Sequence, residues 1–283
     1  MPFVLAKIVF TPLLLAACTF VAHRWGDSVG GLLLGLPITS GPVSVFLFAE
    51  HGSGFAETAA RAALLGVVAG AVFCACYALA ATRMRWWQSL GIAYSVCLAT
   101  AWMLSLVHLS LAQSLVLVVG ALVLLAVAMG AVPHGGRSAE MGRSVDSPAP
   151  AEVRPAAGLV ARMLVASVSV VAVTAVAGLL GPSVGGLLAP LPVLAAVMAA
   201  SSHRRGARSE AHGLLRGAVV GSWGGAAFFA VVAMMLTNSG PAVTYGTATA
   251  AALVVGAIAM GVHESQGAWR VVRGLVVTAT HLA

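Results

Sequence analysis

The segment LPITSGPVS, residues 36–44, brings hydroxyl groups and helix-breaking residues together inside an apolar stretch. Proline has no N–H group and its ring clashes with the preceding turn, so carbonyl groups near Leu33 and Ile38 lose their usual donors. In lipid those carbonyls need side chains, water or a ligand as partners. The segment therefore predicts a polar binding site, with a packing kink as the alternative. The candidate substrate-path residues are Pro37, Thr39, Ser40, Gly41, Pro42 and Ser44.

Basic residues at the ends of apolar segments are the second candidates for chemistry. They form two matched pairs, Lys7 with Arg162 and Arg61 with Arg216. Such cations can attract an anionic substrate or a lipid head group, or they can snorkel from a helix end to the interface. For Arg61 a third interpretation is local pairing, because Glu57 lies four residues earlier on the same expected helix.

Titratable groups that could couple transport to protons are scarce. None of the eight Asp and Glu residues lies in the middle of an apolar segment. Ion-coupled pumps commonly carry a buried carboxylate, so this pattern argues against a carboxylate-based antiporter. Histidine titrates near neutral pH and can serve instead, although a polar residue at a helix end is often only an interfacial group. The coupling candidates are Glu50, Glu57, His108 and His263.

No residue pattern indicates an enzyme, a metal site or a cofactor. The P-loop lysine, the H-E-x-x-H pattern and Cys/His metal spacing are all missing from the sequence. The GxxxG pair Gly66 and Gly70 recurs as Gly221 and Gly225, and this spacing favours close packing of helices in lipid. The four cysteines lie in apolar runs, where we interpret them as small packing residues.

The elements that position these residues are expected to be membrane-spanning helices. Of 283 residues, 60% are hydrophobic and 8% are charged, and the mean hydropathy is +1.00. A soluble domain carries about a quarter charged residues. A helix needs roughly 20 residues to cross about 30 Å of hydrocarbon. The net charge of +7 does not indicate a nucleic-acid partner, because the basic residues lie in turns between apolar runs.

The sequence predicts an all-α polytopic membrane protein with nine transmembrane helices. The expected divisions are a first four-helix repeat (1–108), a linking transmembrane helix (109–132), a cytoplasmic linker (133–157), a second, inverted four-helix repeat (158–263) and a C-terminal tail (264–283). The nine apolar segments are 3–22, 28–48, 59–82, 87–107, 109–132, 158–180, 183–202, 211–236 and 241–262.

The two repeats are recognised by a constant offset of 155 residues. SVGGLLLGLP (28–37) returns as SVGGLLAPLP (183–192), and the same offset aligns Arg61 with Arg216 and each glycine of the GxxxG pair with its later copy. Composition alone would give scattered alanine and leucine matches, so coincident proline, arginine and glycine indicate a duplication. The second copy, APLPVLAAV (189–197), is expected to keep the kink, but it loses the hydroxyl groups.

The distribution of basic residues predicts the orientation of the chain. If all nine segments span, every basic residue except Lys7 and Arg61, out of 15, falls on one side. Basic loops stay in the cytoplasm. This predicts insertion in the cytoplasmic (inner) membrane, with the N-terminus outside and the C-terminus inside. The odd number of segments before the second copy makes the repeats inverted, as in many secondary transporters.

In plan, the chain resembles the small multidrug resistance and the drug/metabolite transporters. The buried glutamate of the small multidrug family's first helix has no match, since that segment carries Lys7, Thr11 and Cys18. Each repeat also resembles the GlpM-like small membrane proteins in an early basic residue, a glycine–proline turn and an arginine opening the third segment. These features are Lys7, Gly31 to Pro37 and Arg61, and then Arg162, Gly186 to Pro192 and Arg216.

The function that fits these patterns is secondary transport or export of a small molecule, an anion among the candidates, by alternating access. Two alternatives stay open: a flippase for lipid or polyprenyl phosphate, which would depend on the cations, and a membrane accessory protein, which would use the glycine faces for a partner. The expected partners are membrane lipid and a small-molecule substrate. Oligomeric state does not follow from the sequence.

Overall fold

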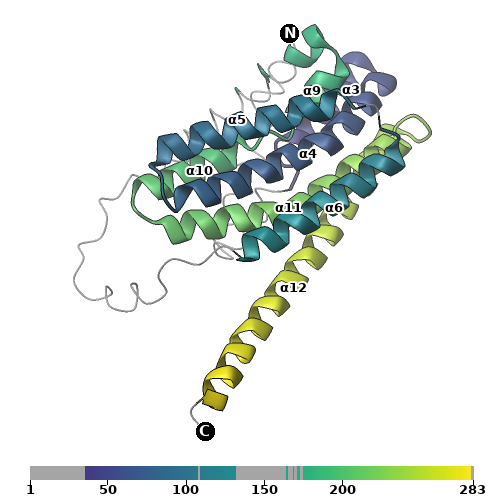
Figure 1. Cartoon of the computed structure of the whole chain (residues 1–283). Coiled ribbons are helices and arrows are strands. Elements are labelled where there is room, and N and C mark those ends of the chain that lie inside the picture. Colours follow the sequence, from purple (N-terminus) through teal and green to yellow (C-terminus); the bar gives the residue numbers. More distant parts are fainter. Residues whose placement is uncertain are drawn as a thin grey trace.

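The computed structural model describes residues 36–107, 109–131 and 175–281, with a few isolated positions between 164 and 172. Side chains are described up to residue 262. Every regular element in these ranges is an α-helix, and the helices form an elongated bundle (Figure 1). The helices are α3 (Ser40–His51), α4 (Ser53–Ala81), α5 (Trp86–Ser105), α6 (Leu111–Ala131), α9 (Pro182–Leu188), α10 (Val193–Arg204), α11 (Arg208–Met235) and α12 (Pro241–His281).

Five stretches of this part of the chain are long and apolar enough to cross a membrane. They are Ser53–Ala81, Leu111–Gly130, Pro182–Arg204, Arg208–Met235 and Pro241–Val262. Helix α5 has 20 residues and exposes large apolar side chains such as Leu98 and Trp102. Helices of this length match the hydrocarbon thickness of about 30 Å. The helices are those of a membrane protein.

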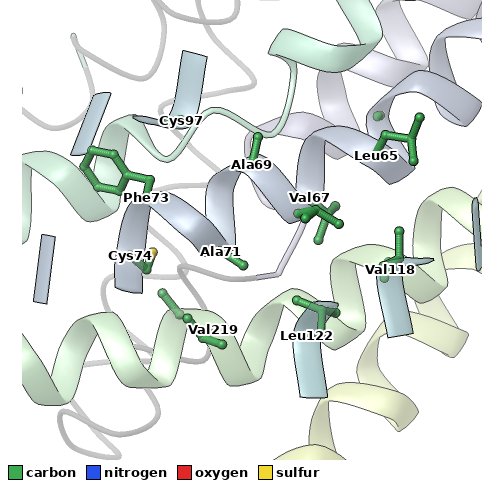
Figure 2. Close-up of a cluster of buried hydrophobic side chains, with 14 of the residues drawn as sticks. Leu65, Val67, Ala69, Ala71, Phe73, Cys74, Cys97, Val118, Leu122 and Val219 are labelled. Atoms are coloured by element: carbon green, nitrogen blue, oxygen red, sulfur yellow. The ribbon is translucent and has the colours of Figure 1, made fainter. Parts of the chain in front are cut away.

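Helices α4 and α11 form the centre of the bundle. Their apolar windows are 78% and 67% buried, whereas those of α6 and α12 are each only 17% buried. Figure 2 shows Cys74 of α4, Leu122 of α6 and Val219 of α11 in one apolar cluster. The exposed apolar faces of the outer helices α5, α6 and α12 suit contact with lipid chains.

The contacts of α9 and α10 fix the direction of the central helices. Gly186 at the end of α9 packs on Ala59, and further along both segments Tyr77 of α4 contacts His203 at the end of α10. The α9–α10 segment therefore runs in the same direction as α4. A tight turn at Gly206, whose φ is +86°, then reverses the chain into α11. Helix α11 consequently runs opposite to α4 (Figure 1).

Glycines on α4 let the backbone of the interrupted helix come close. A Cβ atom on Gly66 would overlap the carbonyl oxygen of Leu187, and one on Gly70 would lie 3.1 Å from that of Pro190. Both carbonyls flank the interruption between α9 and α10. The GxxxG pair predicted to pack closely therefore packs against the main chain of the second half.

Helix bounds differ from the expected segments in an informative way. Helix α4 begins at Ser53 and α11 at Arg208, ahead of segments expected to start at 59 and 211. Segment 183–202 is divided into α9 and α10 at Pro190 and Pro192, where the sequence predicted a kink. Helix α12 continues to His281 instead of ending near 262. The helices that extend beyond the apolar segments do so because hydropathy marks transfer into lipid, whereas a helix continues into water as long as its backbone bonds persist. The expected segments 3–22 and the linker 133–157 lie outside the described residues.

Replacing Gly66 by alanine should destabilise the protein. The added methyl group meets backbone, which cannot rotate aside, so we expect a loss of about 1–3 kcal/mol from overpacking. Thermal unfolding of the purified protein in detergent measures the effect as a lower midpoint.

Gly54→Ala on the same helix is the matched control, since a Cβ there meets nothing within 4 Å. Alanine also has the higher helix propensity, so its midpoint should equal or exceed that of the parent. Equal midpoints for the two variants would contradict the close packing at Gly66.

Candidate functional site

The hydroxyl-rich segment of the first half begins with a tight turn at Pro37. The amide of Ile38 donates to the carbonyl of Leu36 at 2.7 Å, and the amide of Gly41 donates to the carbonyl of Pro37 at 2.7 Å. Helix α3 then begins at Ser40. Pro37, Thr39 and Pro42 are half-buried, whereas the remaining path candidates, Ser40, Gly41 and Ser44, are buried.

The second half contains the same turn at Pro192. Val193 donates to the carbonyl of Leu191 at 2.8 Å, and Ala196 donates to that of Pro192 at 2.8 Å. The φ and ψ angles of Pro192, −82° and 54°, are those of an inverse γ-turn. Proline suits this position because it fixes φ and needs no donor. Each of these bonds lies 155 residues after its counterpart in the first half.

Ser44 is bound by a tyrosine from the other half of the chain. The hydroxyl of Tyr245 donates to the backbone carbonyl of Ser44 at 2.9 Å and lies 3.1 Å from Ser44 Oγ. One proton arrangement satisfies both contacts, with Ser44 Oγ donating to the tyrosine oxygen. The rings of Phe48 and Phe228 stand 6.3 Å from that of Tyr245. Two aromatic rings therefore neighbour the ring of the tyrosine that binds Ser44.

A second polar contact joins the two halves at Tyr77 and His203. The tyrosine oxygen lies 3.4 Å from His203 Nδ1, and both side chains are buried. The adjacent Ser202 donates to Glu210 at 3.0 Å, and Arg205 reaches the same carboxylate at 3.4 Å. This contact lies toward the end of the bundle where α4 and α10 finish, whereas Tyr245 lies in the second turn of α12, toward the opposite end.

No motif in the sequence marks Tyr245, Tyr77 or His203 as functional. An offset of 155 aligns Tyr245 with Leu90 and Tyr77 with Val232, so the repeat gave no signal for either tyrosine. The available signal was rarity, because the chain has only three tyrosines. A buried tyrosine hydroxyl in an apolar helix requires a partner, and that partner came from a distant segment.

Arg61 pairs with a carboxylate on its own helix. Its Nη2 and Nε atoms donate to Glu57 Oε1 at 2.8 and 3.1 Å, the local pairing that the spacing allowed. The arginine side chain is 50% exposed. Glu50 is exposed at the end of α3, near His51, whose ring stacks on that of Phe55 at 4.2 Å. These charged groups lie at the end of the bundle, beyond the buried hydroxyls.

The other charged candidates are only partly covered by the structure. Arg216 lies half-buried on α11. Lys7, Arg162 and His108 lie outside the described residues, and for His263 only its place in α12 is described. Within the described ranges, no three His, Cys, Asp or Glu side chains are grouped as metal ligands. Cys74 and Cys97 are buried with free thiols.

Comparison of the chain with protein-family models, with curated proteins and with solved structures found no match. Any functional conclusion therefore depends on the geometry of the chain itself. That geometry offers buried hydroxyl groups beside the first proline turn, an interruption between α9 and α10, and a hydrogen-bonded contact between the two halves toward each end of the bundle.

Removing the hydroxyl of Tyr245 should weaken the contact between α3 and α12. Tyr245→Phe keeps the ring contacts and removes both hydrogen-bonding contacts to Ser44, so we expect a loss of about 0.6–1.7 kcal/mol. A double-mutant cycle with Ser44→Ala, read by thermal unfolding in detergent, isolates the hydroxyl–hydroxyl contribution.

Tyr94→Phe is the control for removing a tyrosine hydroxyl from a packed ring. The ring centroid of Tyr94 lies 4.7 Å from that of Phe73. No hydrogen bond of its hydroxyl is present among the described residues. Its unfolding midpoint should stay within the error of the parent. Additive effects of Tyr245→Phe and Ser44→Ala would show that the two hydroxyl groups are not coupled.

Proposed function

We propose that this protein is a secondary transporter or exporter of a small molecule that works by alternating access. The observation that carries the proposal is the repeated proline turn, which separates α9 from α10 in the second half and precedes α3 in the first. Interrupted helices at matched positions commonly form the substrate sites of transporters, because their backbone groups are free to bind ligands and ions.

We further propose that the two halves are inverted repeats within a nine-span architecture. Several described bounds support this: α4 and α11 begin at Ser53 and Arg208, and α5 and α12 begin at Trp86 and Pro241, each with an offset of 155. The opposite directions of α4 and α11 are those that an inverted duplication requires.

The two contacts between the halves suit gates at the two ends of a path. Ser44–Tyr245 joins α3 to α12 toward one end, and Tyr77–His203 joins α4 to α10 toward the other. Rocking of one half against the other would open one contact while the other stays closed. In this proposal, the state with both contacts made would be closed at both ends.

The described residues favour hydroxyl groups over cations as the substrate contacts. The charge of Arg61 is offset by Glu57 at 2.8 Å and is half-exposed, whereas Ser40 and Ser44 are each 5% exposed beside the interruption. The glycines also argue for transport over an accessory role. Gly66 and Gly70 are covered by the α9–α10 segment of the same chain, so they do not offer a free helix face to a partner.

We propose that the end carrying the α4–α5 and α10–α11 turns faces the cytoplasm, because the arginines gather there. With an impermeant maleimide on intact cells, Asn238→Cys in the α11–α12 turn should be labelled. Met84→Cys in the α4–α5 turn should be labelled only after permeabilisation. The parent protein gives the background of the native cysteines, and the reversed pattern would overturn the orientation.

Ligand binding at the interrupted helix can be tested by thermal stabilisation. The purified protein is heated with metabolites, antibiotics or lipid phosphates. A specific ligand at a hundredfold excess over its dissociation constant adds about 2.7 kcal/mol to the free energy of unfolding. We expect at least one solute to raise the unfolding midpoint of the parent protein. The same solute should not raise the midpoint of Ser40→Ala or Thr39→Ala. Thr39 makes no side-chain capping bond, so its replacement has little cost of its own.

Thr100→Ala is the control, since this exposed hydroxyl on α5 bonds only to the carbonyl of Val96 among the described residues. A stabilising solute that is unaffected by both path variants would contradict the hydroxyl site. Stabilisation by lipid phosphates alone that requires Arg61 would favour the flippase alternative.

A further inference from the structure

One end of the bundle carries exposed arginines from two turns that lie side by side. Residues 82–85 connect α4 to α5, and residues 205–207 connect α10 to α11. The turns are neighbours because Tyr77 and His203, shortly before them, approach to 3.4 Å. We name the exposed arginines of these turns and their flanking helix ends the arginine surface; they are Arg83, Arg85, Arg204, Arg205 and Arg208.

Most of this positive charge is not neutralised by the part of the chain that the structure describes. Within it, only Arg205 of the arginine surface has a carboxylate within 4.0 Å, that of Glu210 at 3.4 Å. At the opposite end of the bundle, Arg61 is paired with Glu57 at 2.8 Å. Among the described residues, the arginine surface therefore has a local excess of positive charge that the other end lacks.

The neighbouring side chains place the arginine surface at the depth of lipid head groups. Met84 and Trp87, beside the arginines of the first turn, are 40% and 54% exposed. Tryptophan concentrates at the membrane–water interface. Further along α5, Leu98 and Trp102 are exposed in the same way, so an apolar face continues from this turn toward the far end of the helix.

We propose that the arginine surface binds the phosphate groups of anionic phospholipids. Guanidinium groups form paired, charge-assisted hydrogen bonds with phosphate oxygens. A lipid is the fitting source of that phosphate, because the acyl chains of a bound molecule would lie on the apolar face of α5. A head group between the two turns would link the first half of the chain to the second. The proposal is independent of transport.

The binding should be strong enough to measure and sensitive to salt. An arginine near an anionic surface contributes roughly a fivefold change in affinity, and the attraction fades as salt shortens the Debye length from about 10 Å at 0.1 M. In the orientation proposed above, these arginines would also orient the chain during insertion. A binding experiment on purified protein separates the two roles, since insertion is already complete.

The experiment uses the full-length protein purified in a mild detergent. Phosphatidylglycerol, phosphatidylcholine and inorganic phosphate are titrated separately, and retained lipid is counted by native mass spectrometry with thermal unfolding in parallel. We expect phosphatidylglycerol alone to bind and stabilise. The variants Arg83→Gln with Arg85→Gln, and Arg204→Gln with Arg208→Gln, should each weaken its binding on the order of tenfold.

Arg61→Gln is the matched control, because its charge is already paired and lies at the other end; phosphatidylglycerol binding should be unchanged. The exposed positions make misfolding of the variants unexpected, and the unliganded unfolding midpoint checks it. Equal binding of phosphatidylcholine, equal stabilisation by inorganic phosphate, or full binding by both double variants would each overturn the proposal. Failure here would leave the hydroxyl-site test untouched, because that test depends on Ser40 and Thr39.

Discussion

The close approach of α4 to the interrupted α9–α10 segment is the contact on which the bundle depends. Gly66 and Gly70 present bare backbone where the carbonyls of Leu187 and Pro190 project. Lipid supplies no hydrophobic force between helices, so association requires close packing and short polar contacts. Any side chain at these glycines would push the two halves apart at their centre.

A related contact connects α11 to the first half. A Cβ atom on Gly224 would lie 2.6 Å from a side-chain carbon of Leu36, next to the first proline turn, and Gly41 lies near the ring of Phe228. Each long central helix therefore packs against the proline turn that belongs to the other half. This exchange explains why the hydroxyl groups near Pro37 meet residues about 200 positions away, such as Tyr245.

The apolar interior of a membrane explains where the polar and charged side chains of this chain lie. In the described ranges the buried polar side chains are serines, one threonine and His203, and the Asp, Glu, Lys and Arg residues lie outside the buried core. An unpaired charge in hydrocarbon is costly, whereas a hydroxyl can bond to a carbonyl of its own helix, as Ser222 does with Ala218. The hydroxyl groups of Ser44 and Tyr245 instead bond to each other across two helices. Their hydrogen bonds can therefore break and form again when the helices move.

The sequence by itself determined the helical class, the places where helices break and the spacing that allowed Arg61 to pair with Glu57. These properties are local, because proline geometry, apolar length and an i,i+4 spacing act within a few turns. Only the tertiary structure decided that Tyr245 reaches Ser44, that Tyr77 meets His203 and that the α4–α5 and α10–α11 turns lie together. Each of these pairs joins segments more than 100 residues apart, and no local pattern encodes which helix faces which. That choice is made by packing, where Gly66 and Gly70 admit the backbone of one particular neighbour.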